Sequence, residues 1–246
     1  MNSRRQDSLA PAPRRSGRFP LVSALVTAVL ISPAIAFAAP DDAGRRAEVA
    51  VGAGYLYRQA ASDASGVRYG GDLALDVQAR AYAARWLRVS ACFQRGHSSV
   101  DVPSGAAGIA YDSLELGSAL SYSLGARLEP TWHVTDRFRA SLILGVAWGR
   151  LQVPTMTVHE AGAQYRVKPR SGSFLEYPLG VGVAVDILPN RLSVAFESTV
   201  APHTAQSGEL FGTVQYTNDH GKLGHVQAMP QLHLSIANML HLVLAL

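Results

Sequence analysis

The chain has 246 residues, of which 48% are hydrophobic and 16% are charged, and its formal net charge is +4 at pH 7. This charge does not indicate nucleic-acid binding: five of the 22 basic residues and one of the 18 acidic residues lie in the first 38 positions, so the rest carries 17 of each and is neutral. A single cysteine, Cys92, excludes an internal disulfide. After the first 38 residues the sequence has no second long apolar run, so it does not have the pattern of a helical membrane protein.

Residues 1–38 have the pattern of a cleavable export signal. Five arginines precede an apolar run that ends in Ala36-Phe37-Ala38, and small residues two apart are typical of a cleavage site. The sequence therefore predicts export with cleavage after about Ala38, followed by a short N-terminal segment at 39–45. An uncleaved membrane anchor is the alternative interpretation of this run.

From residue 46 onward, apolar side chains alternate with polar or small ones. Side chains on a strand point alternately to opposite faces, so this pattern predicts sheets with one apolar and one polar face. The regular segments are 46–58, 70–83, 87–97, 112–134, 138–151, 174–188 and 192–201. The less regular ones are 210–217, 226–237 and 240–246, with a turn expected at Asn238-Met239. The count of antiparallel strands is thus eight to ten.

Aromatic residues gather at the two ends of these segments. One group lies beside short turns and comprises Trp86, Trp132 and Phe138. A second group lies beside long loops and comprises Tyr55, Tyr57, Trp148, Phe174 and Tyr177. Two aromatic belts separated by aliphatic positions are typical of the two interfaces of a membrane-spanning barrel.

The chain from 46 to 246 resembles the small outer-membrane β-barrels of Gram-negative bacteria, the OmpA type and related families. The resemblance rests on the alternation, the turns and a last strand that keeps its alternation up to Leu246. Such barrels usually end in an aromatic residue, whereas this chain ends in leucine. The resemblance implies an all-β, antiparallel up-and-down transmembrane barrel in the outer membrane, with membrane lipids and the barrel insertion machinery as partners.

Charged residues occupy the alternate positions that carry polar side chains. We call these positions the polar parity of a strand, and in such a barrel they face the lumen. We expect these side chains to form an ion-pair network in a narrow, filled lumen, because buried charges are costly unless they are paired. The candidates are Glu48, Arg58, Asp72, Asp76, Arg80, Arg88, Glu115, Arg127, Glu129, Arg139, Glu176, Asp186, Arg191 and Glu197. A small gated pore for ions or solutes, lined by the same charges and with space left by inward glycines, is the alternative hypothesis.

Enzymatic function, a cofactor and a metal site are not expected. His97 and Ser98 are sequence neighbours and point to opposite faces of a strand, which argues against an acyl-hydrolase dyad, and His159-Glu160 lacks a second histidine ligand. The long loops could instead bind a surface partner, or lipopolysaccharide through Arg166, Lys168 and Arg170. A soluble lipocalin-like periplasmic barrel, with its apolar face turned inward, also remains open. The sequence does not indicate an oligomeric state.

Overall fold

A computed structural model describes residues 47–61, 66–105, 111–217, 221 and 223–246. The predicted export signal, its cleavage site and the segment 39–45 lie outside the described residues. In the part of the chain that is described, no helix has the length and hydropathy needed to cross a membrane.

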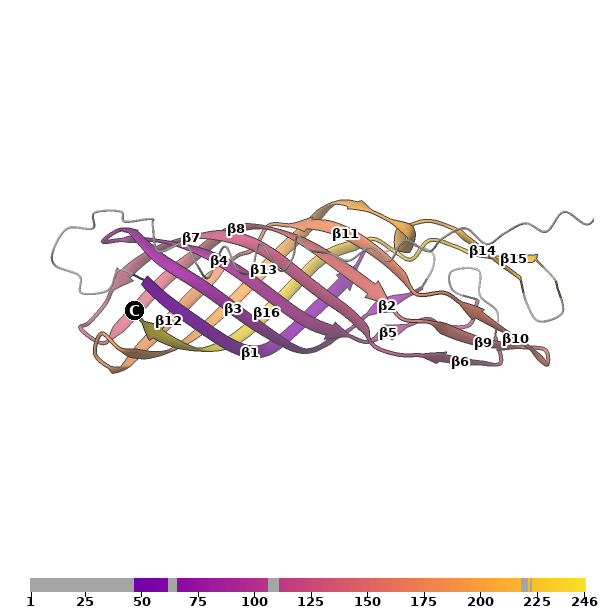
Figure 1. The fold of residues 1–246 in the computed structure, drawn as a ribbon, viewed down its shortest axis with the longest axis horizontal. Coiled ribbons are helices and arrows are strands. Elements are labelled where there is room, and N and C mark those ends of the chain that lie inside the picture. Colours follow the sequence, from indigo (N-terminus) through magenta and orange to yellow (C-terminus); the bar gives the residue numbers. More distant parts are fainter. Residues whose placement is uncertain (1–46, 62–65, 106–110, 218–220, 222) are drawn as a thin grey trace, which may run out of the picture. The chain divides into compact units, whose positions relative to one another are not determined.

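Eight antiparallel strands within the described residues close into a ring (Figure 1). Each pairs with its two neighbours, and the pairing of the first strand with the last closes the barrel. In ring order the strands are β1 (Ala47–Ala60), β3 (Gly71–Ala84), β4 (Leu87–Ser98), β7 (Ala119–His133), β8 (Phe138–Val153), β12 (Leu179–Leu188), β13 (Leu192–Ser207) and β16 (Leu232–Ala245).

The strand β11 (Arg170–Glu176) continues the line of β12, since both pair with β8 on one side and β13 on the other. The two are separated at Tyr177-Pro178, where proline lacks the N–H that a central strand would donate. The Pro178 carbonyl still accepts a hydrogen bond of 2.8 Å from Gly145 N. Together β11 and β12 form the single strand expected at 174–188.

Three sequence-based expectations about the strands are corrected. Asn238-Met239 is not a turn, because Asn238 pairs with Tyr55 on one side and Ser198 on the other, inside the continuous strand β16. The segment 210–217 contributes no ring strand, and the segment 112–134 is interrupted at Gly117-Ser118. In place of a ring strand at 210–217 the chain forms a 3-10 turn, η2 (Glu209–Phe211), and the strand β14 (Val214–Thr217). Before the break at Gly117-Ser118 it forms the short strand β6 (Ser113–Leu116).

Short connections lie at one end of the barrel, and the chain between the strands at the other end forms further small sheets. The short turn between β12 and β13 contains Asn190 with φ 57°, a left-handed conformation that asparagine tolerates. We call the structure at the opposite end the extension (Figure 1). It comprises η2, β6, β14, β2 (Arg68–Tyr69), β5 (Val100–Asp101), β9 (Met156–Glu160), β10 (Ala163–Val167) and β15 (Leu223–Val226).

The outer face of the ring is apolar and exposed. Leu73, Val181 and Leu240 have 60%, 55% and 59% of their surface exposed, and similar side chains surround the barrel. A soluble lipocalin-like barrel would have the opposite arrangement, with these side chains inside, so that alternative is wrong. The barrel's alternation therefore turns its apolar parity outward and its polar parity inward.

Seven of the eight predicted belt aromatics lie on the outer face. Tyr55, Trp86, Trp132, Trp148 and Tyr177 are exposed, and Tyr57 and Phe138 are partly exposed. Phe174 is the exception, with only 1% of its surface exposed. Because Leu175 and Tyr177 hold the outward parity of this strand, Phe174 points into the barrel.

The extension encloses a separate hydrophobic core. Its members come from the small sheets, from η2, from β11, from the adjoining ends of ring strands and from connecting segments. They are Val67, Tyr69, Val102, Ala119, Leu151, Val153, Met156, Val158, Tyr165, Val167, Phe174, Leu210, Val226, Met229 and Leu232. These side chains form an apolar core next to the charged lumen.

Candidate functional site: the charged barrel interior

Eleven of the fourteen charged residues assigned to the lumen by the sequence are buried inside the barrel. They are six acids and five arginines, namely Glu48, Asp76, Glu129, Glu176, Asp186, Glu197, Arg58, Arg80, Arg88, Arg127 and Arg139. All five arginines form ion pairs with one or two of these acids. The polar face thus forms one charged interior rather than scattered pairs.

Three assignments are corrected by the structure. Asp72 has the inward parity but lies exposed near the end of β3, where its Oδ1 accepts a hydrogen bond from Leu73 N. Glu115 is exposed on β6, which belongs to the extension rather than to the ring. Arg191 is exposed in the short turn before β13. Each of the three lies beyond the enclosed part of the lumen, where parity alone does not produce burial.

Near the short-turn end, Arg88 on β4 lies between two glutamates. Its Nε donates to Glu129 Oε2 at 2.8 Å on the neighbouring strand β7, and its Nη1 donates to Glu48 Oε2 at 3.1 Å. Ser90 Oγ donates to the other oxygen of Glu129 at 2.6 Å. The two carboxylates are therefore held by a shared guanidinium, as buried charges require.

Arg139 on β8 extends this cluster to the other side of the barrel. Its Nη1 donates to Glu48 Oε1 at 2.8 Å and to the Tyr82 hydroxyl at 2.6 Å. Its Nη2 lies 3.0 Å from Ser193 Oγ and 3.4 Å from Asp186 Oδ1. Glu48 is thus bound by two arginines from different strands, which links β1, β4 and β8 through the lumen.

A second cluster surrounds Glu197 on β13. Arg80 from β3 pairs with Glu197 Oε1, and Arg127 from β7 donates to Oε2 at 3.0 Å. Arg127 also lies 3.8 Å from Asp76 Oδ2. Glu197 is 3% exposed, so its charge is balanced almost entirely by these two guanidinium groups.

Two members of this second cluster were missed by the sequence analysis. Gln78 Nε2 donates to Asp76 Oδ1 at 2.7 Å and to Glu197 Oε2 at 3.1 Å, and His241 Nε2 lies 3.0 Å from Asp76 Oδ1. Their parity would have identified both, since Gln78 lies between inward Asp76 and Arg80, and His241 alternates with outward leucines. A Cβ on Gly52, which pairs with His241, would overlap the imidazole ring, so glycine makes room for it.

A third cluster lies at the boundary with the extension. The guanidinium of Arg58 on β1 lies 3.8 Å from Glu176 and donates to Ser121 Oγ at 3.2 Å. The guanidinium carbon Cζ of Arg58 lies 5.0 Å from the centre of the Phe174 ring, within reach of a cation–π contact. Phe174 also packs edge-on against His203 at 4.8 Å. This is the place where the charged interior meets the apolar core.

Two of the inward glycines lie against larger side chains. A Cβ on Gly149 would overlap two atoms of the Phe174 ring, and one on Gly182 would lie 2.7 Å from Ser141 Oγ. A cavity beside Arg88 and Arg139 has a volume of only about 10 Å³, which is room for one water molecule at most. At these two positions, larger neighbours occupy the space that the pore hypothesis assigned to small residues.

The residues considered for catalysis or metal binding are not brought together. His97 is exposed on the outer face of β4, whereas Ser98 is fully buried on the opposite face. His159 lies on β9 in the extension. Among the described residues, no three His, Cys, Asp or Glu side chains converge as ligands for a metal ion.

Comparisons with known proteins agree with this architecture. No protein-family model matches the sequence, and no curated protein is similar to it at a significant level. Among solved structures, a major outer membrane protein from Thermus thermophilus is 16% identical with a TM-score of 0.52, the match covering 81% of this chain and 99% of that one. Neisserial surface protein A is 11% identical with a TM-score of 0.47 and coverage of 83% and 98%. The fold of this chain is that of an antiparallel outer-membrane β-barrel, as in the Thermus thermophilus protein.

Proposed function

We propose that this protein is an integral outer-membrane barrel that does not conduct ions and that holds the extension at the cell surface. The observation that carries the proposal is the pairing of six acids and five arginines across a filled lumen, inside a wall whose outer face is apolar. Its role is therefore structural or one of surface interaction rather than transport.

Membrane insertion is supported by the energetics of the two faces. Exposed leucine and valine side chains over the whole outer wall would be unfavourable in water, and lipid removes this cost. A closed ring also leaves no unpaired backbone groups in the hydrocarbon region. With the short turns toward the periplasm, as is usual for such barrels, the extension lies outside the cell.

A closed lumen is supported by the number of cross-strand ion pairs and by the apolar core beyond them. An ion entering the barrel would have to displace Arg88 or Arg139 from Glu48, leaving a buried charge without its partner. From the other end it would first meet the fifteen apolar residues of the extension core. Both barriers oppose steady conduction.

Membrane integration is tested by fractionation. The protein should stay with membranes after a carbonate wash and should migrate differently on gels before and after heating. Release of the folded protein into the soluble fraction would overturn the proposal.

Closure is tested by planar-bilayer recordings. The unmodified protein should give no steady conductance, whereas a triple Arg127→Ala, Glu129→Ala, Arg139→Ala variant should show openings because it removes bulk from two clusters at once. Glu115→Ala, on the exposed surface of the extension, is the matched control. A variant that fails the heat-shift assay is replaced by Arg139→Ala alone. A robust ion-selective channel in the unmodified protein would support the gated pore instead.

A further inference from the structure

Two arginines break the apolar outer face of the barrel. In the described ring strands and β11, the outward parity carries Asp, Glu, Lys or Arg at only two positions, Arg95 on β4 and Arg150 on β8. Their neighbours on the same face are Phe93 and Trp148, which are 36% and 46% exposed. All other charged positions of these strands have the inward parity.

The two arginines belong to one cross-strand row. Arg95 pairs with Tyr122 on β7, and Tyr122 pairs with Arg150. Neighbouring strands are about 4.8 Å apart, so the two arginines stand roughly 10 Å apart with the tyrosine between them. The Tyr122 ring also contacts Trp148, at 6.4 Å between ring centres. This spacing suits two guanidinium groups around one anionic headgroup.

The row lies toward the extension end of the barrel. Arg95 is three residues from the end of β4 and Arg150 is three residues from the end of β8, both ends leading into the extension. An open groove of about 530 Å³ adjoins the row on this side, where Leu120, Gln152 and Ser171 contribute to its lining. A charged side chain here would be tolerated at a membrane interface, but not at the midplane.

We propose that Arg95, Tyr122 and Arg150 bind the phosphate-bearing headgroup of an outer-leaflet lipid; this rests on the proposed membrane location. Arg150 Nη2 donates to Ser171 Oγ at 2.7 Å, which positions its guanidinium. No acidic side chain among the described residues pairs with either arginine. Arginine binds phosphate oxygens in a bidentate manner, so a phosphate supplies the missing negative charge.

The occupant is a lipid rather than a soluble anion because of what surrounds the row. Immediately toward the short-turn end lie Phe93, Leu124 and Trp148, which would contact the acyl chains of the same molecule. Arg170, one of the three residues first considered for this contact, is less suitable. Arg170 is buried and donates to the carbonyl oxygens of Leu210 and Glu209, at 3.0 Å and 2.8 Å, so its guanidinium is already occupied.

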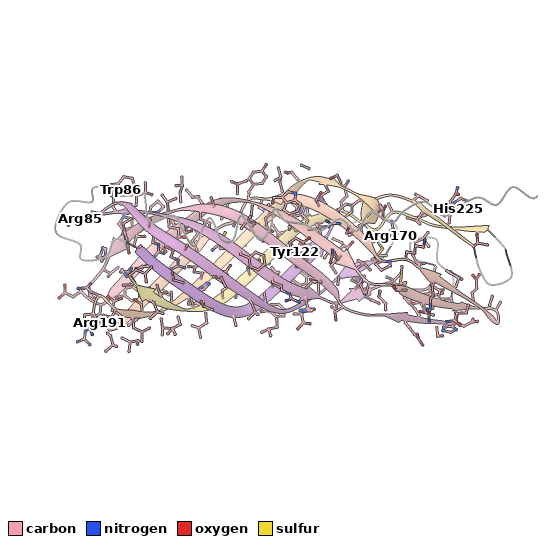
Figure 2. All side chains as sticks on the ribbon, viewed as in Figure 1. Arg85, Trp86, Tyr122, Arg170, Arg191 and His225 are labelled. Carbon is pink, nitrogen blue, oxygen red and sulfur yellow. The ribbon has the colours of Figure 1, made fainter. Side chains whose placement is uncertain are left out.

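The binding can be measured by fluorescence quenching of Trp148. The chain has three tryptophans, and the other two lie beside the short turns, so a Trp86→Phe, Trp132→Phe variant leaves Trp148 as the one reporter next to the row. Figure 2 shows Trp86 near one end of the barrel and Tyr122, the central residue of the row, away from that end. The folded protein is placed in phosphatidylcholine vesicles containing a small fraction of lipid with brominated chains, either phosphatidylcholine or phosphatidic acid. Quenching by brominated phosphatidylcholine reports membrane insertion alone and therefore tests the proposed function separately.

The expected result is stronger quenching by the brominated phosphatidic acid, through roughly 30-fold enrichment around the barrel, or about fivefold for each arginine. Arg95→Gln with Arg150→Gln should abolish the preference, while Arg85→Gln, at the short-turn end, should retain it (Figure 2). Equal quenching by both lipids would overturn the proposal. So would a preference that survives the double substitution, or one that free inorganic phosphate removes, since the last would indicate a site for soluble anions.

Discussion

The barrel interior and the extension core solve the same packing problem with opposite side chains. Around Glu197 the interior is filled mainly by arginines, carboxylates and a histidine, whereas Val158 belongs to a cluster of buried apolar residues in the extension. Both are built from strands with a period of two. The difference lies in which parity points inward.

The reversal follows the surroundings of the outer face. In β10 of the extension, Tyr165 and Val167 are buried while Gln164 and Arg166 are exposed, as expected for a sheet in water. In the ring strands the apolar parity is outside, as expected for a sheet in lipid, and the interior receives the polar parity. The comparison teaches that alternation determines two faces, and that the solvent decides which one becomes the core.

Removing the central acid should have the largest effect on the barrel. Glu197→Leu leaves Arg80 and Arg127 without their main partner and should destabilise the protein by about 3–5 kcal/mol. Urea unfolding in lipid vesicles measures this free energy, and Glu115→Gln should change it by less than about 0.5 kcal/mol, since Glu115 is exposed. A loss below about 1 kcal/mol would show that the ion pairs are not what stabilises the interior.

Placing a charge on the outer wall should destabilise the barrel slightly less than the removal of Glu197. Leu144→Arg and Val183→Arg should each destabilise by about 2–4 kcal/mol if they lie near the membrane midplane, because the guanidinium enters hydrocarbon. Ala184→Ser, on the opposite face of the same strand as Val183, should be mild. The same unfolding assay applies, and equal effects on both faces would contradict the assignment of the two parities.

A cavity in the extension core should destabilise the extension without destabilising the ring. Leu210→Ala should destabilise the extension by about 2–3 kcal/mol through lost apolar burial, while the ring keeps its stability. Amide hydrogen exchange should show faster exchange in 156–167 and unchanged protection in β3 and β4. If both regions lost protection together, the interior and the extension would be one cooperative unit rather than two.

The smallest effect is expected at the boundary between the two cores. Gly149→Ala would bring a Cβ into overlap with the Phe174 ring and should cost about 1–2 kcal/mol. Adding Phe174→Leu should recover part of this loss, although Phe174→Leu by itself removes the contact with Arg58. A double-mutant cycle in urea measures the coupling, and purely additive losses would show that the two positions do not share space.

The sequence by itself determined the strands, their two faces and most of the lumen. Period-two alternation is a local property, so it assigned Glu129 and Arg139 to the interior and Leu144 and Val183 to the wall without any knowledge of partners. It also predicted the belt positions of Trp86 and Trp148. The strand segments predicted from 46 to 201 agree with ring strands apart from two breaks, one between β6 and β7 and one between β11 and β12, whereas the strands β2, β5, β9 and β10 were not predicted.

Only the tertiary structure decided which charges meet and where the enclosed lumen ends. Glu48 and Arg139 are 91 residues apart in sequence, and their contact depends on the closure of the ring through β1 and β16. For the same reason parity misplaced Asp72 and Glu115, which have no strand across the lumen to cover them. Parity places His241 on the inward face, but it does not show that His241 meets Asp76. Alternation specifies the face of the strand on which each side chain lies. Its burial and its ion-pair partners depend on the strands that the rest of the chain places across the lumen.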